Sequence, residues 1–307
     1  MRTVSDPQDL PLALKSVSLR ALTLLAVLTW LAYQTKPWVF TVDVGQLRTN
    51  FSWLKTLGTY TWSWFGFARH VCAWLALLLA WRLSVSVHSN RYPRGSQTGR
   101  WLLWSLASLG LSVVVQAGLE ARALGLEEFV GMAFALLSVG LISLALGNRK
   151  HVQSILSIWV IVFAYGTILA YQLEPGISTA PAFGHVTKTF SLLPTLGTQQ
   201  LVHAIDYALF FAWFGVMLAV AACARSSSST SFQKLSAAAM GKTDPSAGAV
   251  VFALGWKLPL VAALAVAATE LAQYWIPGRG VDSSPVLFTV LGYLFANRLI
   301  SRAKPII

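Results

Sequence analysis

Glu270 and Gln273 are two polar residues in an otherwise apolar run near the C-terminus. Their spacing of three residues places both side chains on one face of a helix. The break Pro277–Gly278 follows, and Arg279 and Asp282 then stand in a short turn before the next apolar run. An ionisable residue within a membrane segment is energetically costly and marks a candidate functional site. This stretch therefore predicts a polar site of carboxylate, amide and guanidinium groups.

A second polar set, His203, Asp206 and Tyr207, stands at positions i, i+3 and i+4 at the start of another apolar run. One helix face carries all three side chains. Glu270 lies about 9 Å from the outer end of its own helix, at 1.5 Å per residue. Both sets are expected at the same depth, near the outer leaflet, where charges are tolerated if they face the bundle interior or water. They are predicted to line one polar pocket that opens to the outside.

Three chemistries fit these residues. In the first, Arg279 pairs with Glu270 or Asp282 and ties helices together, since buried polar groups must be satisfied. In the second, Arg279 binds a phosphate or carboxylate. In the third, Glu270 or His203 acts as an acid or base while Arg279 stabilises developing charge. The sequence shows no activated nucleophile, glycine-rich phosphate loop or metal-ligand motif, so neither a cofactor nor a metal is predicted.

The composition excludes a soluble protein. Hydrophobic residues make up 56% of the chain and charged residues 11%, and the mean hydropathy is +0.62, which is typical of a polytopic membrane protein. Thirteen tryptophans fit aromatic belts at the two membrane interfaces. The net charge of +12 is explained by basic cytoplasmic loops. The predicted partner is thus the lipid bilayer and not nucleic acid.

Apolar windows long enough to cross a bilayer predict an all-α, polytopic integral membrane bundle of about eight transmembrane helices. They lie near Val17–Tyr33, Trp64–Trp81, Trp101–Leu119, Phe129–Leu146, Ile155–Leu173, Leu201–Cys223, Leu258–Trp275 and Val286–Ile300.

The distribution of charge orients these helices. Both termini and every second loop, with the helix ends beside them, hold 16 of the 23 basic residues and only three acids, whereas the remaining segments of the chain hold seven basic residues and eight acids. By the positive-inside rule, both termini face the cytoplasm. The expected location is the bacterial inner membrane, with Glu270, Arg279 and Asp282 toward the outer face.

The two halves of the chain resemble each other. Residues 31–34 read LAYQ and recur as residues 169–172, while NFSWLKTLG at 50–58 matches TFSLLPTLG at 189–197. The shift of about 139 residues equals four helices with their loops. An even number of helices per unit predicts two parallel repeats related by an axis along the membrane normal. The predicted domains are therefore residues 1–150 and 151–307.

The first repeat retains only part of the polar set. Gln116 and Arg122 have the spacing of Gln273 and Arg279, but Val113 stands where Glu270 would be. The first half is therefore expected to serve mainly in packing. Its adjacent charges at Arg69 and His70 have two interpretations: a paired structural charge, or side chains that line the same polar cavity.

Around Thr269–Gly292 the sequence resembles the VanZ-like family of bacterial membrane proteins. The family pattern has a TE-x-x-Q helix, a PGR turn, then an acidic pair, an Asn and a Gly at the start of the next helix, and an upstream helix with His, Tyr and Gly. The resemblance covers about Thr189–Arg298, while Pro285 and Thr289 depart from the acid and the Asn that are usual there. The matching positions are Thr269, Glu270, Gln273, Pro277, Gly278, Arg279, Asp282 and Gly292, with His203, Tyr207 and Gly215 upstream.

The resemblance implies a role in the cell envelope. The name-giving member of the family confers low-level resistance to the glycopeptide teicoplanin, an antibiotic, and relatives accompany envelope or exopolysaccharide genes. The expected function is binding of a lipid-linked or anionic envelope component, or a glycopeptide, with Arg279 as the anion contact. The alternatives are a membrane-embedded transferase or hydrolase, and a non-catalytic structural partner in an envelope complex. Whether the protein is an enzyme stays open.

Overall fold

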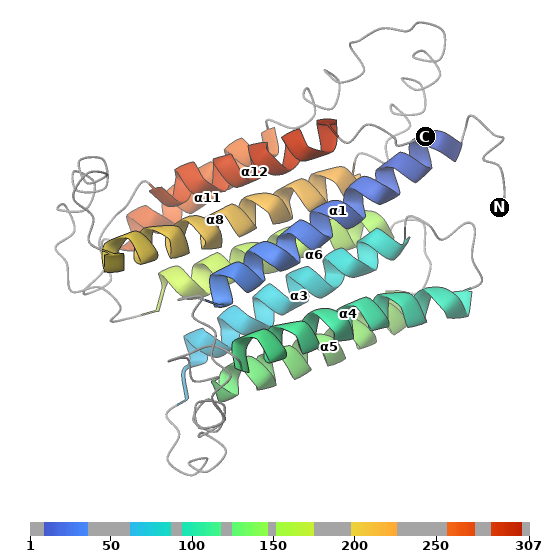
Figure 1. The fold of residues 1–307 in the computed structure, drawn as a ribbon, viewed down its shortest axis with the longest axis horizontal. Helices are drawn as coiled ribbons and strands as arrows, with labels where there is room; N and C mark the ends of the chain where they lie inside the picture. The colour runs from blue at the N-terminus through green and yellow to red at the C-terminus, as the bar shows by residue number, and fades with distance from the viewer. Residues whose placement is uncertain are drawn as a thin grey trace, which may run out of the picture.

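The computed structural model describes residues 9–35, 62–86, 94–117, 125–146, 152–174, 198–225, 257–273 and 284–302. Within these residues all regular secondary structure is helical, as the sequence predicts, and there is no strand (Figure 1). The eight helices are α1 (Asp9–Gln34), α3 (Trp64–Ser86), α4 (Arg94–Ala117), α5 (Leu126–Leu146), α6 (Val152–Gln172), α8 (Thr198–Arg225), α11 (Lys257–Ala272) and α12 (Ser284–Arg302).

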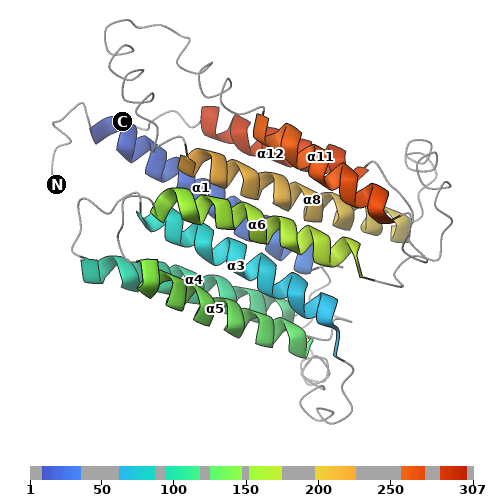
Figure 2. The same cartoon turned by 180° about the vertical axis from the view of Figure 1, so that it is seen from behind.

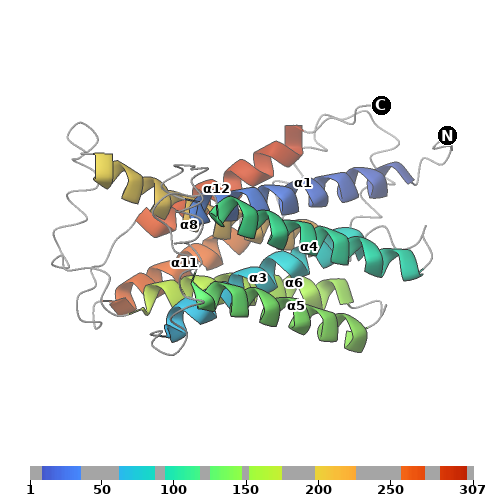
Figure 3. The same ribbon diagram turned by 60° about the horizontal axis from the view of Figure 1, so that its bottom comes forward.

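Successive helices run in alternating directions and lie along one common direction (Figures 1 and 3). As a result, α1, α4, α6 and α11 end at the same side of the bundle at which α3, α5, α8 and α12 begin (Figures 1 and 2). We call this side the polar end, because it carries a set of buried polar residues at these helix ends and beginnings.

Four of the described helices are long and apolar enough to cross a membrane, by their length and composition. Several such helices in one chain indicate a membrane protein. Another apolar segment, Leu19–Gln34, is shorter. The four apolar spans are Trp64–Val85, Leu126–Ser143, Val152–Gln172 and Tyr207–Arg225.

The core is formed by α1, α3, α6 and α8. Helix α3 packs mainly on α6, and α1 packs mainly on α8. Residues 73–81 of α3 are all buried, and so are residues 213–221 of α8, and both segments are apolar all round, as fully buried helices are. Helices α4 and α5 flank α3, while α11 and α12 lie beyond α8 and α6 (Figures 1 and 2).

Two glycines let α8 and α12 approach closely. A Cβ atom on Gly215 would meet the backbone of Thr289 and Tyr293, and a Cβ atom on Gly292 would meet the backbone of Ala212. Small residues at such crossings allow backbones to pack against each other, the usual device of helices in lipid. Gly215 and Gly292 are both positions on which the resemblance depends, and here they form one helix–helix contact.

Candidate functional site

Glu270 is buried at the polar end of α11, with 2% of its surface exposed. The amide Nε2 of Gln172, in the last turn of α6, donates a hydrogen bond to Glu270 Oε1 at 2.6 Å. The amide of Gln273 donates to the same oxygen at 3.4 Å. One turn lies between Glu270 and Gln273, so the predicted shared face exists and points at α6. The carboxylate is thus held by two amide donors away from lipid.

Contacts between α6 and α11 hold this carboxylate in place. The hydroxyl of Tyr165 on α6 donates to the backbone carbonyl of Ala265 on α11 at 3.2 Å. The hydroxyl of Thr269 turns back to the carbonyl of Val266 in its own helix at 2.8 Å. Thr269 therefore donates its hydroxyl within its own helix, and the polar contacts between the two helices are those of Tyr165 with Ala265 and of Gln172 with Glu270.

One polar atom of this group has no hydrogen-bond partner. Gln172 is fully buried, and its Oε1 accepts no hydrogen bond. Leaving a buried acceptor unsatisfied costs about 1–3 kcal/mol. The amide is oriented by the bond from its nitrogen to Glu270, and its oxygen is left as a buried acceptor without a donor. Sequence reasoning did not single out Gln172, although the repeated LAYQ block ends on it.

The remaining predicted site residues are placed only in part. Arg279 and Asp282 lie outside the described residues. The backbone of α8 includes His203 and Asp206, but their side chains are outside the described part. Tyr207 packs its ring on Tyr171 of α6 and on Phe211, with ring centroids 6.2 and 4.9 Å apart. Of the seven predicted residues, the structure therefore brings together Glu270 and Gln273 and directs Tyr207 toward α6.

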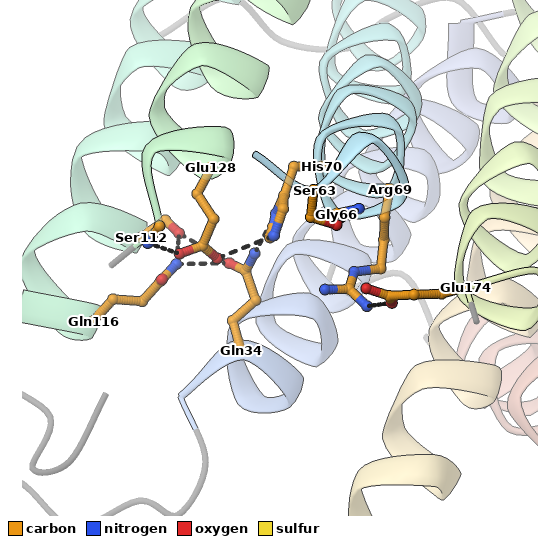
Figure 4. Close-up of polar contacts among 10 residues, drawn as sticks. Gln34, Ser63, Gly66, Arg69, His70, Ser112, Gln116, Glu128 and Glu174 are labelled. Atoms are coloured by element: carbon orange, nitrogen blue, oxygen red, sulfur yellow. Dashed lines mark hydrogen bonds and ion pairs between the residues drawn. The ribbon is translucent and has the colours of Figure 1, made fainter. Parts of the chain in front are cut away.

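Arg69 lies between the two halves of the chain. Its guanidinium Nη1 is 3.2 Å from Glu174 Oε2, just after α6, and its Cζ lies 5.9 Å from the centre of the Tyr171 ring. The ion pair therefore bridges α3 and the end of α6 (Figure 4). Of the two interpretations of Arg69, the structure supports the paired structural charge.

The neighbouring residue, His70, belongs to a separate buried network (Figure 4). Its Nε2 is 3.3 Å from Glu128 Oε1 on α5, and its Nδ1 is 3.4 Å from Gln34 Nε2 at the end of α1. Gln34 Oε1 accepts hydrogen bonds from Ser112 Oγ at 3.1 Å and from Gln116 Nε2 at 2.9 Å, both on α4. These residues are between 0 and 7% exposed. The network thus connects four helices, α1, α3, α4 and α5.

The first half therefore also holds a buried polar network at the polar end. Sequence reasoning missed Gln34 and Ser112. The available signals were the Gln that ends the first LAYQ block and the i, i+4 spacing of Ser112 and Gln116, which places both on one helix face.

The acidic start of α5 also has local structural roles. The backbone N–H of Ser63 donates to Glu127 Oε1 at 2.8 Å, and that of Gly125 to Glu128 Oε2 at 3.4 Å. The Ser63 hydroxyl accepts from the N–H of Gly66 and caps α3. Carboxylates in a first helical turn are favoured by the helix dipole. Contacts within the chain thus hold Glu127 and Glu128 in place.

No protein-family model, curated protein or solved structure matches this chain. Within the described helices there is no group of three His, Cys, Asp or Glu side chains arranged to hold a metal ion. Any assignment of function therefore rests on the geometry of the polar end. This geometry offers two buried amide clusters at one end of the bundle, each organised around the Gln that ends a LAYQ block.

Proposed function

We propose that the chain is a polytopic membrane protein with about eight spans, built from two parallel four-helix repeats at residues 1–150 and 151–307. The proposal is supported by matching contacts in the two halves. Gln34 receives hydrogen bonds from Ser112 and Gln116, while Gln172 bonds Glu270. In each half a Gln at the end of the first helix thus meets the polar face of the third helix.

Helix packing adds further support. The first helix of each proposed repeat packs on the second helix of the other, α1 on α8 and α6 on α3. A two-fold axis along the bundle requires this exchange. The small-residue contact of α8 with α12 also has a counterpart between α3 and α5, where a Cβ on Gly131 would lie 3.0 Å from His70 Cβ.

We place both termini on the cytoplasmic side of a bacterial inner membrane, following the basic residues, so that the polar end faces outward. Outward faces of α4, α5, α11 and α12 carry large apolar side chains that suit contact with lipid. They include Leu103, Val114, Leu137, Leu141, Val261, Leu264, Leu291 and Phe295.

We propose that the protein is VanZ-like and that the polar end of its second half binds a lipid-linked or anionic component of the cell envelope. The observation that carries this proposal is the buried Glu270–Gln172 pair, in which one carbonyl oxygen lacks a donor. A hydroxyl or amide N–H of a glycan or peptide headgroup would donate to this oxygen. Arg279 would bind the phosphate of the same ligand bidentately.

The test uses the full-length protein in lipid nanodiscs and a photocrosslinkable analogue of undecaprenyl phosphate. Arg279→Ala is expected to weaken labelling about tenfold or more, as loss of a charge-assisted hydrogen bond of about 1.5–3 kcal/mol predicts, without lowering the melting temperature. Arg298→Ala, at the opposite end of α12, is the matched control. Equal labelling of the Arg279→Ala protein and the wild type would contradict the proposal.

The second candidate is a purely structural role, and the short 2.6 Å bond between α6 and α11 favours it. Glu270→Gln separates the candidates. An amide oxygen still accepts from Gln172, so we expect a loss of only about 1 kcal/mol in stability. A binding site would lose labelling well beyond this change. A structural tie would lose labelling only in proportion to the unfolded fraction in a thermal melt.

A further inference from the structure

The network of the first half has a direction that can be read from its atoms. Gln34 Nε2 is a donor, so His70 Nδ1, 3.4 Å away, must accept. The neutral ring then carries its proton on Nε2, which lies 3.3 Å from Glu128 Oε1. Gln34 Oε1 in turn accepts from Ser112 and Gln116. In this state every hydrogen bond that leads from α4 through α1 runs toward His70.

At the far end of this hydrogen-bond chain, one buried acceptor atom has no hydrogen-bond donor. Gln116 is fully buried, and its Nε2 donates to Gln34 Oε1 and to Ser112 Oγ at 2.8 Å. Its Oε1 accepts no hydrogen bond. A buried acceptor without a donor raises the free energy of this state. The same oxygen is the group that a chain running in the opposite direction would use.

We propose that His70 is a proton-binding site and that its protonation reverses this hydrogen-bond chain. A hydronium ion gives its proton to the Nδ1 lone pair, so that one O–H bond breaks, one N–H bond forms and a water molecule leaves. Nδ1–H is now a donor, so the Gln34 amide turns and presents Oε1 to it. Gln34 Nε2 then faces Ser112 and Gln116. When the Gln116 amide turns as well, its Oε1 accepts from Gln34 Nε2 and from the Ser112 hydroxyl.

The surrounding charges accommodate a cation on His70. Arg69 is paired with Glu174, and Glu127 is held by the backbone of Ser63, so Glu128 is the carboxylate that faces the ring. A buried charge is tolerated when it is paired and hydrogen-bonded. Helix α4 presents the neutral Ser112 and Gln116. Among the side chains that the structure describes at the polar end, the titratable and charged groups of the packed elements are Tyr33 on α1, Arg69 on α3, Glu127 and Glu128 on α5, Tyr171 and Glu174 at the end of α6, and Tyr207 on α8.

The hydrogen-bond chain lies where three helices meet at the polar end. Gln34 ends α1, Gln116 is in the last turn of α4, and Glu128 is in the first turn of α5. Protonation would therefore change the hydrogen bonds that join the ends of three helices at the polar end. If this face is the outer one, as proposed above, the first half senses external pH. The proton site itself depends only on the His70 network and not on that orientation or on ligand binding.

The experiment is nitrogen NMR of the full-length protein in nanodiscs, labelled with ¹⁵N-histidine. The chain has five histidines, and a variant in which His88, His151, His185 and His203 are replaced by Gln reports His70 alone. We expect its ring nitrogens to change from the Nε2–H tautomer to the doubly protonated form within about pH 5–8, the range in which histidine titrates. A ring that keeps one protonation state across this range would overturn the proposal.

Two variants test the partners. Glu128→Gln removes the counter-charge and is expected to lower the pH of half-protonation by about one unit, a tenfold loss in proton affinity. Gln116→Leu removes the acceptor of the reversed chain and is expected to lower it as well. Gly140→Ala on α5, which has open space at its Cβ position, should leave it unchanged. An unchanged midpoint in Gln116→Leu would refute the reversal, and one in Glu128→Gln would refute the pairing.

Discussion

Gly292→Val is expected to abolish the folded protein. The new Cβ would stand on the backbone of Ala212, within 2.6 Å of its Cα, far inside van der Waals contact. Backbone atoms of a buried helix cannot turn away as a flexible side chain can. Overpacking of a tight core costs about 1–3 kcal/mol even where side chains yield, and here α12 would have to leave α8. Gly215→Val should have the same result, because its Cβ would meet Thr289 and Tyr293.

The measurement is the monodisperse fraction of detergent-extracted protein in size-exclusion chromatography. Gly110→Val on α4 and Gly140→Val on α5 are matched controls, since a Cβ at either position meets nothing within 4 Å. Both controls also replace a helical glycine by valine, so they share the modest change in helix propensity without the steric overlap. A sharp, monodisperse peak for Gly292→Val, equal to that of the controls, would contradict the close contact of α8 with α12.

Local sequence patterns predict what lies within one helix. The all-helical fold follows from long apolar runs, and the shared face of Glu270 and Gln273 follows from their spacing. Both features are present in the structure. The eight expected helices correspond to the eight described ones, with ends that differ by several residues. An example is α4, which begins at Arg94, whereas apolarity starts at Trp101.

Local sequence patterns do not predict contacts between different helices. Gln34 meets His70 and Gln116 over sequence separations of 36 and 82 residues. The packing of α1 against α3 and α4 decides these contacts, and no spacing rule within one helix encodes them. The absence of an acid at Val113 suggested that the first half had lost its polar site. In the structure the first half holds a buried polar network, with a carboxylate from Glu128 on α5 and an amide from Gln34 on α1.

The partner of Glu270 was hidden for the same reason. Sequence reasoning offered Arg279 as its partner, because that residue follows closely in the chain; Arg279 lies outside the described residues. The structure places Gln172, 98 residues away, at 2.6 Å. In each half the LAYQ block ends in a Gln that meets the third helix. A repeated polar residue at the end of an apolar run is therefore a stronger sign of a buried contact than a lone charge.

Arg69→Glu is the second substitution for which we expect a large loss of stability. It would place a second carboxylate beside Glu174 at a site where both side chains are only about one-fifth exposed. Removing one partner of a buried pair costs about 3–5 kcal/mol, and partial exposure reduces that cost through solvent screening. A like charge adds repulsion to the lost attraction. We therefore expect a loss of at least about 2 kcal/mol in the free energy of unfolding.

The charge swap Arg69→Glu with Glu174→Arg decides whether the pair itself is responsible. It restores opposite charges between α3 and the end of α6, so a thermal melt should recover most of the loss. Full recovery is not expected, because the wild-type guanidinium also lies over the Tyr171 ring at 5.9 Å, and a cation–π contact contributes about 0.5–1 kcal/mol. If Arg69→Glu and the double variant melt at the same temperature, Arg69 stabilises the protein through its aliphatic chain and its contact with Tyr171. The ion pair would then not be what joins the two halves at the polar end.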